Sequence, residues 1–148
     1  MKKSSRLQRI VRLSTTTERL AAQALAQAQQ EHAELAAQTR DLRAYQAEYL
    51  KRLQHDATLA LNGYEAQQLL LFVRRIEAAI ADLGRKLEVA ARRCTVARER
   101  WVAQHRKVSI ISEVAARARV TEEVSAAARL QHEIDDRVRP RAELATNQ

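Results

Sequence analysis

The sequence predicts an all-α protein: two long helices in an antiparallel coiled-coil hairpin, with helix two overhanging at the C-terminus. Three observations support this prediction. The 148 residues include only two glycines and one proline. A seven-residue apolar repeat runs through most of the second half of the chain. One strong breaker, Asn62-Gly63, separates the two halves.

Composition favours long helices over a compact globule. Ala, Leu, Glu, Gln and Arg dominate the chain, and all five are strong helix formers. Aromatic residues make up only 3%, and a core of alanine and leucine suits thin, extended helix packing. The alternating runs and closely spaced turn dipeptides typical of sheets are missing. We therefore expect a single coiled-coil hairpin over residues 1–148.

The first helix is expected over about residues 5–57. Ser4 could cap its start, or Thr15 with Glu18 could restart it after a basic first turn. A weak stripe with a period near 3.6 marks one helix face. Its members are Leu13, Thr17, Leu20, Ala24, Ala28, Leu35, Leu42, Tyr49 and Leu53.

A turn at about residues 58–63 should join the first helix to a second one over about 64–138. Asn62 can cap the second helix, with Glu65 as the reciprocal partner three residues on. Pro140 should end the helical pattern, which leaves residues 139–148 as a tail. Because two helices joined by a short connection tend to fold back, we expect an antiparallel pair.

The second helix carries the stronger pattern, a seam of fifteen positions in which the steps alternate between four and three. Fourteen of the fifteen are apolar, which predicts a left-handed supercoil with a partner helix. The positions are Leu69, Val73, Ile76, Ile80, Leu83, Leu87, Ala90, Cys94, Ala97, Trp101, Gln104, Val108, Ile111, Ala115 and Ala118.

If the chain folds back at residues 60–62, the numbers of two residues that face each other across the hairpin should sum to roughly 122. Tyr49 should then face Val73, and Ala28 should face Cys94. The start of the first helix should lie opposite about residue 118 of the second helix, so residues beyond 118 have no partner in the first helix. Beyond that point the seam turns polar, so a helical tail without a partner should project from the open end, where the two termini lie.

The sequence lacks the signals of an enzyme or a metal protein. Two glycines cannot build a phosphate-binding loop, and the four histidines are dispersed. Cys94 lies on the seam, which favours a buried, inert thiol. The basic N-terminus lacks the apolar stretch of a signal peptide, and no run is long enough to span a bilayer. We expect a soluble cytoplasmic protein without catalytic residues, metal or cofactors.

Charge and aromatic residues mark two candidate surfaces. The net charge is +8, and basic residues of both helices gather toward the open end. They form either a solvated coiled-coil face or a docking surface for an acidic partner. Near the turn, Tyr45 and Tyr49 should lie beside Phe72, Ile76 and Ala79. These residues either thicken the core or form a partly exposed patch that anchors a protein interface.

Three stretches in order resemble the flagellar FliJ family: "LRAYQAEYLKRL" (42–53), "LFVRRIEAAI" (71–80) and "RERWVAQHRK" (98–107). The resemblance covers nearly the whole chain. It implies a non-catalytic stalk of the bacterial flagellar type III export apparatus, peripheral at the cytoplasmic face of the cell membrane. In this family the open end enters the hexameric ring of the export ATPase. The other part engages the linker of the export-gate membrane protein, and some members also bind export chaperones.

Carried onto this chain, the resemblance implies an export-gate-binding patch of Gln38, Leu42, Tyr45, Tyr49, Phe72, Ile76, Ala79 and Leu83. The candidates for binding the ATPase ring are the basic residues of the open end: Arg6, Arg9, Arg12, Arg106, Lys107, Arg117 and Arg119. We expect a monomeric hairpin with no direct membrane insertion. The alternatives are the equivalent stalk of a virulence-type injectisome, a basic coiled coil that binds nucleic acid, and a self-associating scaffold. No groove-reading motif or row of stacking aromatics supports nucleic acid.

Overall fold

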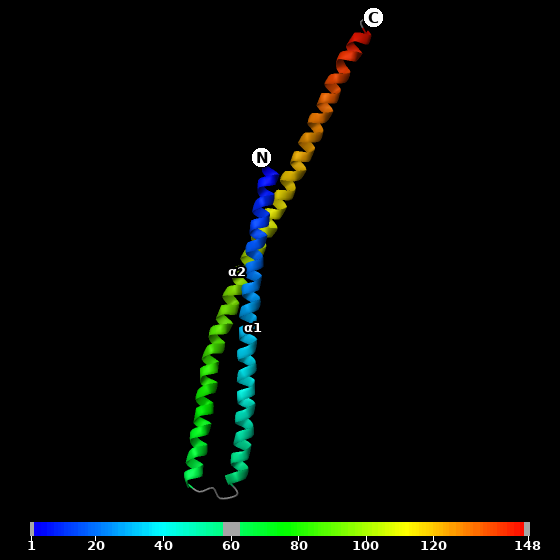
Figure 1. Cartoon of the computed structure of the whole chain (residues 1–148). Coiled ribbons are helices and arrows are strands. Elements are labelled where there is room, and N and C mark those ends of the chain that lie inside the picture. Colours follow the sequence, from blue (N-terminus) through cyan, green and yellow to red (C-terminus); the bar gives the residue numbers. More distant parts are fainter. Residues whose placement is uncertain (1, 58–62, 147–148) are drawn as a thin grey trace. The chain divides into compact units, whose positions relative to one another are not determined.

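The structure, a computed structural model, describes residues 2–57 and 63–146, and these residues form two helices (Figure 1). Helix α1 spans Lys3–Ala57 and helix α2 spans Gly63–Thr146. There is no strand within the described ranges. The predicted fold class, an all-α antiparallel hairpin, is confirmed. The expected turn at 58–62, including the Asn62 cap, lies outside the described residues.

Helix α1 begins at Lys3 and runs without a break, so neither expected capping arrangement is present. Ser4 lies inside the helix and bonds to a residue of α2, described below. The Thr15 hydroxyl donates to the carbonyl oxygen of Val11 at 2.8 Å, a bond from a side chain to the preceding helical turn. Thr15 is therefore an internal helical residue, and the prediction of a restart at this point is wrong.

Helix α2 continues beyond the expected end at residue 138 and passes through Pro140 to Thr146. Proline removes one backbone hydrogen bond and crowds the preceding turn, at a cost of about 3 kcal/mol inside a helix. Its fixed φ is nevertheless close to the helical value, so the helix can continue on both sides of it. The sequence rule that proline ends a helix was too strong here.

The chain divides into two compact units. Unit 1 consists of residues 1–19 and 102–148, and unit 2 consists of residues 20–101. Segments of α1 and α2 lie side by side and antiparallel within each unit (Figure 1). In unit 2, Tyr49 contacts Phe72, and in unit 1, Glu18 contacts His105. The paired numbers sum to 121 and 123, which agrees with the predicted register, whereas the contact of Ser4 with Glu122 in unit 1 sums to 126 and departs from it by four.

The predicted seam of α2 is confirmed. All fifteen of its positions are buried or half-buried. The most buried members are Val73, Ile76, Ala90 and Ala115, with Ala115 only 2% exposed. An apolar residue at every third or fourth position keeps one face of α2 against α1, as the seven-residue repeat requires.

The predicted stripe of α1 is only half right. Its members from Ala28 to Leu53 are half-buried, but Leu13 and Leu20 are 64% and 60% exposed. Thr17 and Ala24 are exposed as well. The true seam of α1 repeats with strict steps of three and four. It consists of Ser4, Leu7, Val11, Ser14, Glu18, Ala21, Leu25, Ala28, His32, Leu35, Thr39, Leu42, Gln46, Tyr49 and Leu53.

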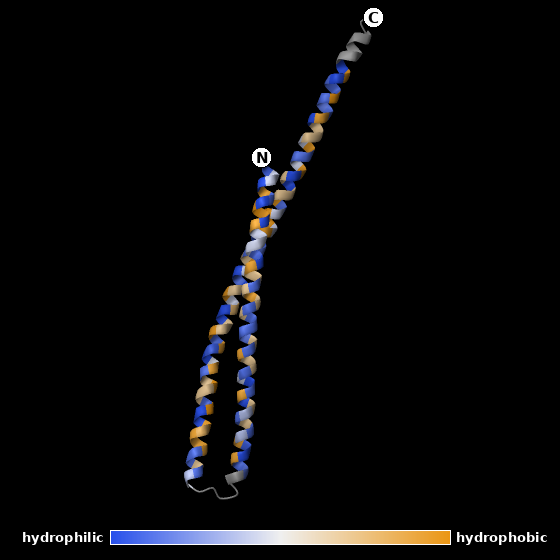
Figure 2. Ribbon diagram, viewed as in Figure 1, coloured by the Kyte–Doolittle hydropathy of each residue, from blue (hydrophilic) through white to orange (hydrophobic). Residues whose placement is uncertain are grey.

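Six of these fifteen α1 positions carry polar side chains, which is why hydrophobicity alone misplaced the first half of the stripe. Small polar residues are tolerated because the helix itself can satisfy them. Thr39, for example, is only 5% exposed, and its hydroxyl donates to the carbonyl oxygen of Leu35 at 2.8 Å. Figure 2 shows the same mixture, with apolar and polar residues interspersed along both helices.

Candidate functional site

An aromatic cluster joins the two helices of unit 2. The ring of Phe72 on α2 lies 4.6 Å from that of Tyr49 and 6.4 Å from that of Tyr45, measured between centroids. The two tyrosine rings of α1 stack at 6.3 Å. All three separations are in or near the favourable range for aromatic pairs. Tyr64 is 71% exposed and makes no ring contact with the described aromatic residues, so it lies outside the cluster.

The eight residues of the predicted export-gate patch lie on one side of this helix pair. Four of them are seam residues: Leu42, Tyr49, Ile76 and Leu83. The other four each precede a seam residue by one position: Gln38, Tyr45, Phe72 and Ala79. In a seven-residue repeat these two kinds of position adjoin one another along one flank of the interface. The structure therefore brings the eight predicted residues onto a common face.

Burial within this patch is graded from the seam to the surface. Ile76 is 6% exposed, whereas Tyr45 is 50% exposed. Tyr49 and Phe72 are half-buried between these extremes. The cluster thus belongs in part to the core and in part to the surface. The buried part agrees with a thickened core and the exposed part with a partly exposed patch, and Tyr45 is its most accessible ring.

The seven basic residues predicted at the open end all belong to unit 1, and all are exposed. Arg117 pairs with Glu113 at 2.6 Å and Arg119 pairs with Glu123 at 3.3 Å, each across one turn of α2. Such exposed pairs contribute about 0.3–0.5 kcal/mol and leave the cations accessible. Because a helix turns by about 100° per residue, the spacing of these residues directs them to several sides of the two helices.

Ser4 and Glu122 form a polar contact between the helices of unit 1. The backbone N–H of Ser4 donates to Oε1 of Glu122 at 3.1 Å, and the Ser4 hydroxyl donates to Oε2 at 2.5 Å. These two bonds, the hydroxyl first and the backbone amide second, hold the pKa of Glu122 below its usual value, and Lys2 adds to the effect. Glu122 of α2 thereby supplies an acceptor for the Ser4 amide, which belongs to the first turn of α1 and has no acceptor within a regular helix.

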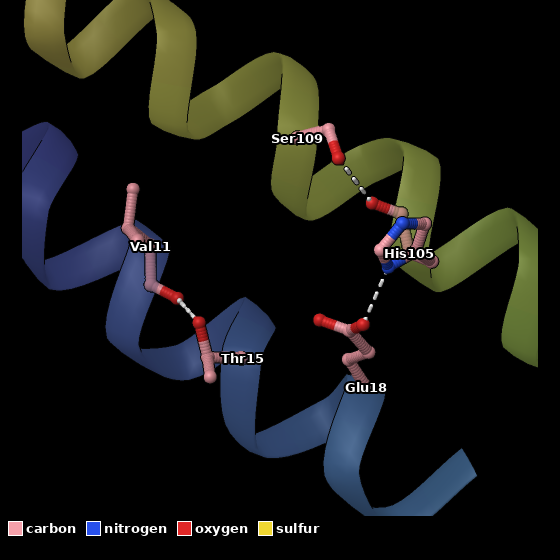
Figure 3. Close-up of polar contacts among 5 residues, drawn as sticks. All are labelled: Val11, Thr15, Glu18, His105 and Ser109. Atoms are coloured by element: carbon pink, nitrogen blue, oxygen red, sulfur yellow. Dashed lines mark hydrogen bonds and ion pairs between the residues drawn. The ribbon is translucent and has the colours of Figure 1, made fainter. Parts of the chain in front are cut away.

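A second contact between the helices joins Glu18 to His105 (Figure 3). Glu18 occupies a seam position of α1, and its Oε1 lies 2.7 Å from Nδ1 of His105 on α2. The Ser109 hydroxyl donates to the carbonyl oxygen of His105 at 3.1 Å. Sequence reasoning missed both polar contacts. The available signal was the strict register, which places Ser4 and Glu18 on the face of α1 that meets α2.

The described residues hold no cluster of three or more His, Cys, Asp or Glu side chains suited to a metal ion. Cys94, which was expected to be buried, is a half-buried free thiol on the α2 seam. Neither helix, over its described residues, has a segment that is both long and apolar enough to cross a membrane. The two candidate surfaces are the aromatic patch of unit 2 and the basic residues of unit 1.

Comparison with known proteins identifies the family. The family model described as flagellar FliJ protein matches residues 2–142, which is nearly the whole chain. No curated protein and no solved structure matches the chain. The family match spans both helices and includes the aromatic patch and the basic residues of unit 1. The chain therefore belongs to the flagellar FliJ family and is a component of the flagellar protein export apparatus.

Proposed function

We propose that this protein is the non-catalytic stalk of the flagellar type III export apparatus. In this role it links the hexameric export ATPase ring to the membrane export gate and promotes export of flagellar proteins. The family match over residues 2–142 is the observation that carries the proposal, and its flagellar description favours this system over an injectisome. The presence of two chemically different surfaces on the two units supports a connector with two partners.

Unit 1 is the part proposed to bind the ATPase ring. A segment enclosed by a ring meets protein on several sides, and the exposed cations of unit 1 point in several directions. Their charge would attract acidic side chains lining such a ring and speed the encounter. The α2 segment beyond Glu122 extends this unit with exposed side chains throughout residues 123–139.

Unit 2 is the part proposed to bind the linker of the export gate. Tyr, Trp and Phe side chains often dominate binding energy because they bury a large area at little cost in conformational entropy. The Tyr45 ring is half-exposed and is held in place by Tyr49 and Phe72. A preformed ring cluster of this kind can accept a partner without reorganising the helices.

The proposed mechanism is mechanical rather than chemical. The seven-residue seam keeps α1 and α2 in one register, so each surface is presented in a fixed arrangement on its own unit. ATP binding and hydrolysis belong to the partner ATPase. The proposal places the protein in the cytoplasm at the inner face of the cell membrane, where export chaperones are further candidate partners.

The test replaces both tyrosines of the patch and measures binding to the isolated gate linker. Tyr45→Ala with Tyr49→Ala should weaken binding at least tenfold, because the accessible ring and its support are both removed. Tyr64→Ala is the matched control, since Tyr64 is a more exposed tyrosine outside the cluster. Circular dichroism should show unchanged helicity in both variants. Unchanged affinity in the double variant would refute the assignment of this surface.

A further inference from the structure

The C-terminal part of α2 carries an apolar face that nothing in the described chain covers. Residues 123–139 are all exposed, and the former seam turns polar at Ser125, Arg129 and His132. A different face of the same segment is apolar. The exposed fractions of its large side chains range from 46% to 64%. Those side chains are Val120, Val124, Leu130, Ile134 and Val138.

This apolar face has the repeat of a coiled-coil seam. Val120, Val124, Ala127, Gln131, Ile134 and Val138 follow one another in steps of four and three. The stripe starts two residues after Ala118, the last apolar residue of the α1-facing seam, and is therefore rotated by about 200° from it. Six positions with a 3.5-residue period predict a second helix lying along the stripe.

We infer that the occupant is the same segment of a second copy of this chain, paired antiparallel about a two-fold axis at residue 129. The pattern is self-complementary around this centre. In such a pair, two residues that pack against each other across the interface have residue numbers that sum to 258. The pairings are Val120 with Val138, Val124 with Ile134, and Ala127 with Gln131, and the two-fold axis makes each of them occur twice. A face that matches its own reverse is what a two-fold symmetric dimer requires.

Charge selects the antiparallel arrangement over the parallel one. Glu123 and Arg137 each precede a stripe residue by one position, and these positions face one another in antiparallel pairs. Glu123 of each copy therefore meets Arg137 of the other, which makes two attractive contacts. Leu130, at the equivalent central position, meets its own counterpart. In a parallel pair, Glu123 would lie beside Ala128 and gain no opposite charge.

The pairing is compatible with the contacts already present in unit 1. Glu123 pairs across one turn with Arg119, in a solvent-exposed ion pair that is easily exchanged. Glu122, which holds Ser4, lies outside the stripe.

Three repeats make a short interface, so we expect a weak, reversible dimer that forms as concentration rises. The inference does not depend on the proposed stalk function. A dimer of this kind would cover the apolar stripe from Val120 to Val138 and keep other partners from binding there.

Sedimentation equilibrium of the full chain, from micromolar to about millimolar concentration, tests the inference. Wild type should show a monomer–dimer equilibrium. Glu123→Arg and Arg137→Glu should each weaken dimerisation at least tenfold, because each places like charges at both contacts. An equimolar mixture of the two variants should associate again, since every contact then joins opposite charges. Glu133→Arg is the matched control, because Glu133 lies off the stripe, and it should dimerise as wild type does.

Three outcomes would overturn the inference. A wild-type chain that stays monomeric over the whole concentration range excludes self-pairing of the tail. A dimer that persists in both charge variants, or in Ile134→Asp, places the association elsewhere. Restoration by mixing is specific to the antiparallel register, so a mixture that stays monomeric while wild type dimerises also contradicts it.

Discussion

The seam joins the two helices in both units, but the units differ in the further side-chain contacts that connect their helices. In unit 2, rings and aliphatic side chains meet across the interface, as at Tyr49 and Phe72. In unit 1, the Glu122 carboxylate of α2 accepts from a serine of α1, and the Glu18 carboxylate of α1 contacts a histidine of α2. Apolar contacts are insensitive to pH and resist salt, whereas exposed polar contacts respond to both. Substitution and acidification should therefore separate the two units.

The largest effect on stability is expected from truncating a buried apolar side chain at the helix interface of unit 2. Ile76→Ala removes three carbons from a side chain that is 6% exposed, and should lower the free energy of unfolding by about 2–4 kcal/mol. Leu71→Ala is the control, because Leu71 is 49% exposed on the same helix. Urea unfolding followed by circular dichroism measures both. Equal losses in the two variants would contradict the apolar seam of unit 2.

A smaller, local effect is expected at the polar contact of unit 1. Glu122→Gln should speed hydrogen exchange of the first turn of α1, because the charged acceptor for Ser4 is lost. Acidification should act in the same direction. The folded state lowers the pKa of Glu122, so this contact stabilises the protein at neutral pH, and its contribution disappears as pH falls through that lowered pKa.

The matched control for this contact is Glu133→Gln, because Glu133 is a carboxylate on the exposed segment 123–139 of the same helix. It should leave exchange at residues 3–10 unchanged. If Glu122→Gln also leaves that exchange unchanged at neutral pH, the start of α1 is not held by Glu122.

The smallest effect is expected on the face of α1 that the sequence misplaced. Leu13→Ser should change the free energy of unfolding by less than about 0.5 kcal/mol, because Leu13 is 64% exposed. Val11→Ser, two residues away on the seam, should cost clearly more, since Val11 is half-buried. If thermal or urea unfolding instead showed a larger loss of stability for Leu13→Ser than for Val11→Ser, the interface of α1 would be the stripe predicted from hydrophobicity.

The sequence predicted α2 better than α1 because only α2 marks its buried face with apolar residues. Fourteen apolar residues at fifteen seam positions leave a single choice of face. In α1, Ser14 and Glu18 occupy the interface while Leu13 and Leu20 lie outside it. Apolar side chains are common on protein surfaces, so an exposed leucine does not identify a core. The face of α1 is therefore decided by its pairing with α2.

The candidate surfaces were predicted to a similar, partial extent. The spacing of Tyr45 and Tyr49, together with the register, placed them beside Phe72, and the ring contacts agree. The contacts made by Ser4 and Glu18 were not predicted, because each joins residues about 90 to 120 positions apart. Such contacts depend on the register to within one residue. The extent of α2 beyond Pro140 was also missed, since one proline weakens a helix without always ending it.

In the proposed function, the two units bind two different partners independently. The most direct measurement determines both activities, gate-linker binding and stimulation of the export ATPase, for two variants of the full chain. Tyr45→Ala with Tyr49→Ala should lose linker binding and keep ATPase stimulation. Arg6→Ala with Arg9→Ala and Arg12→Ala should lose stimulation and keep linker binding. Loss of both activities in either variant with helicity intact, or loss of neither, would contradict the claim.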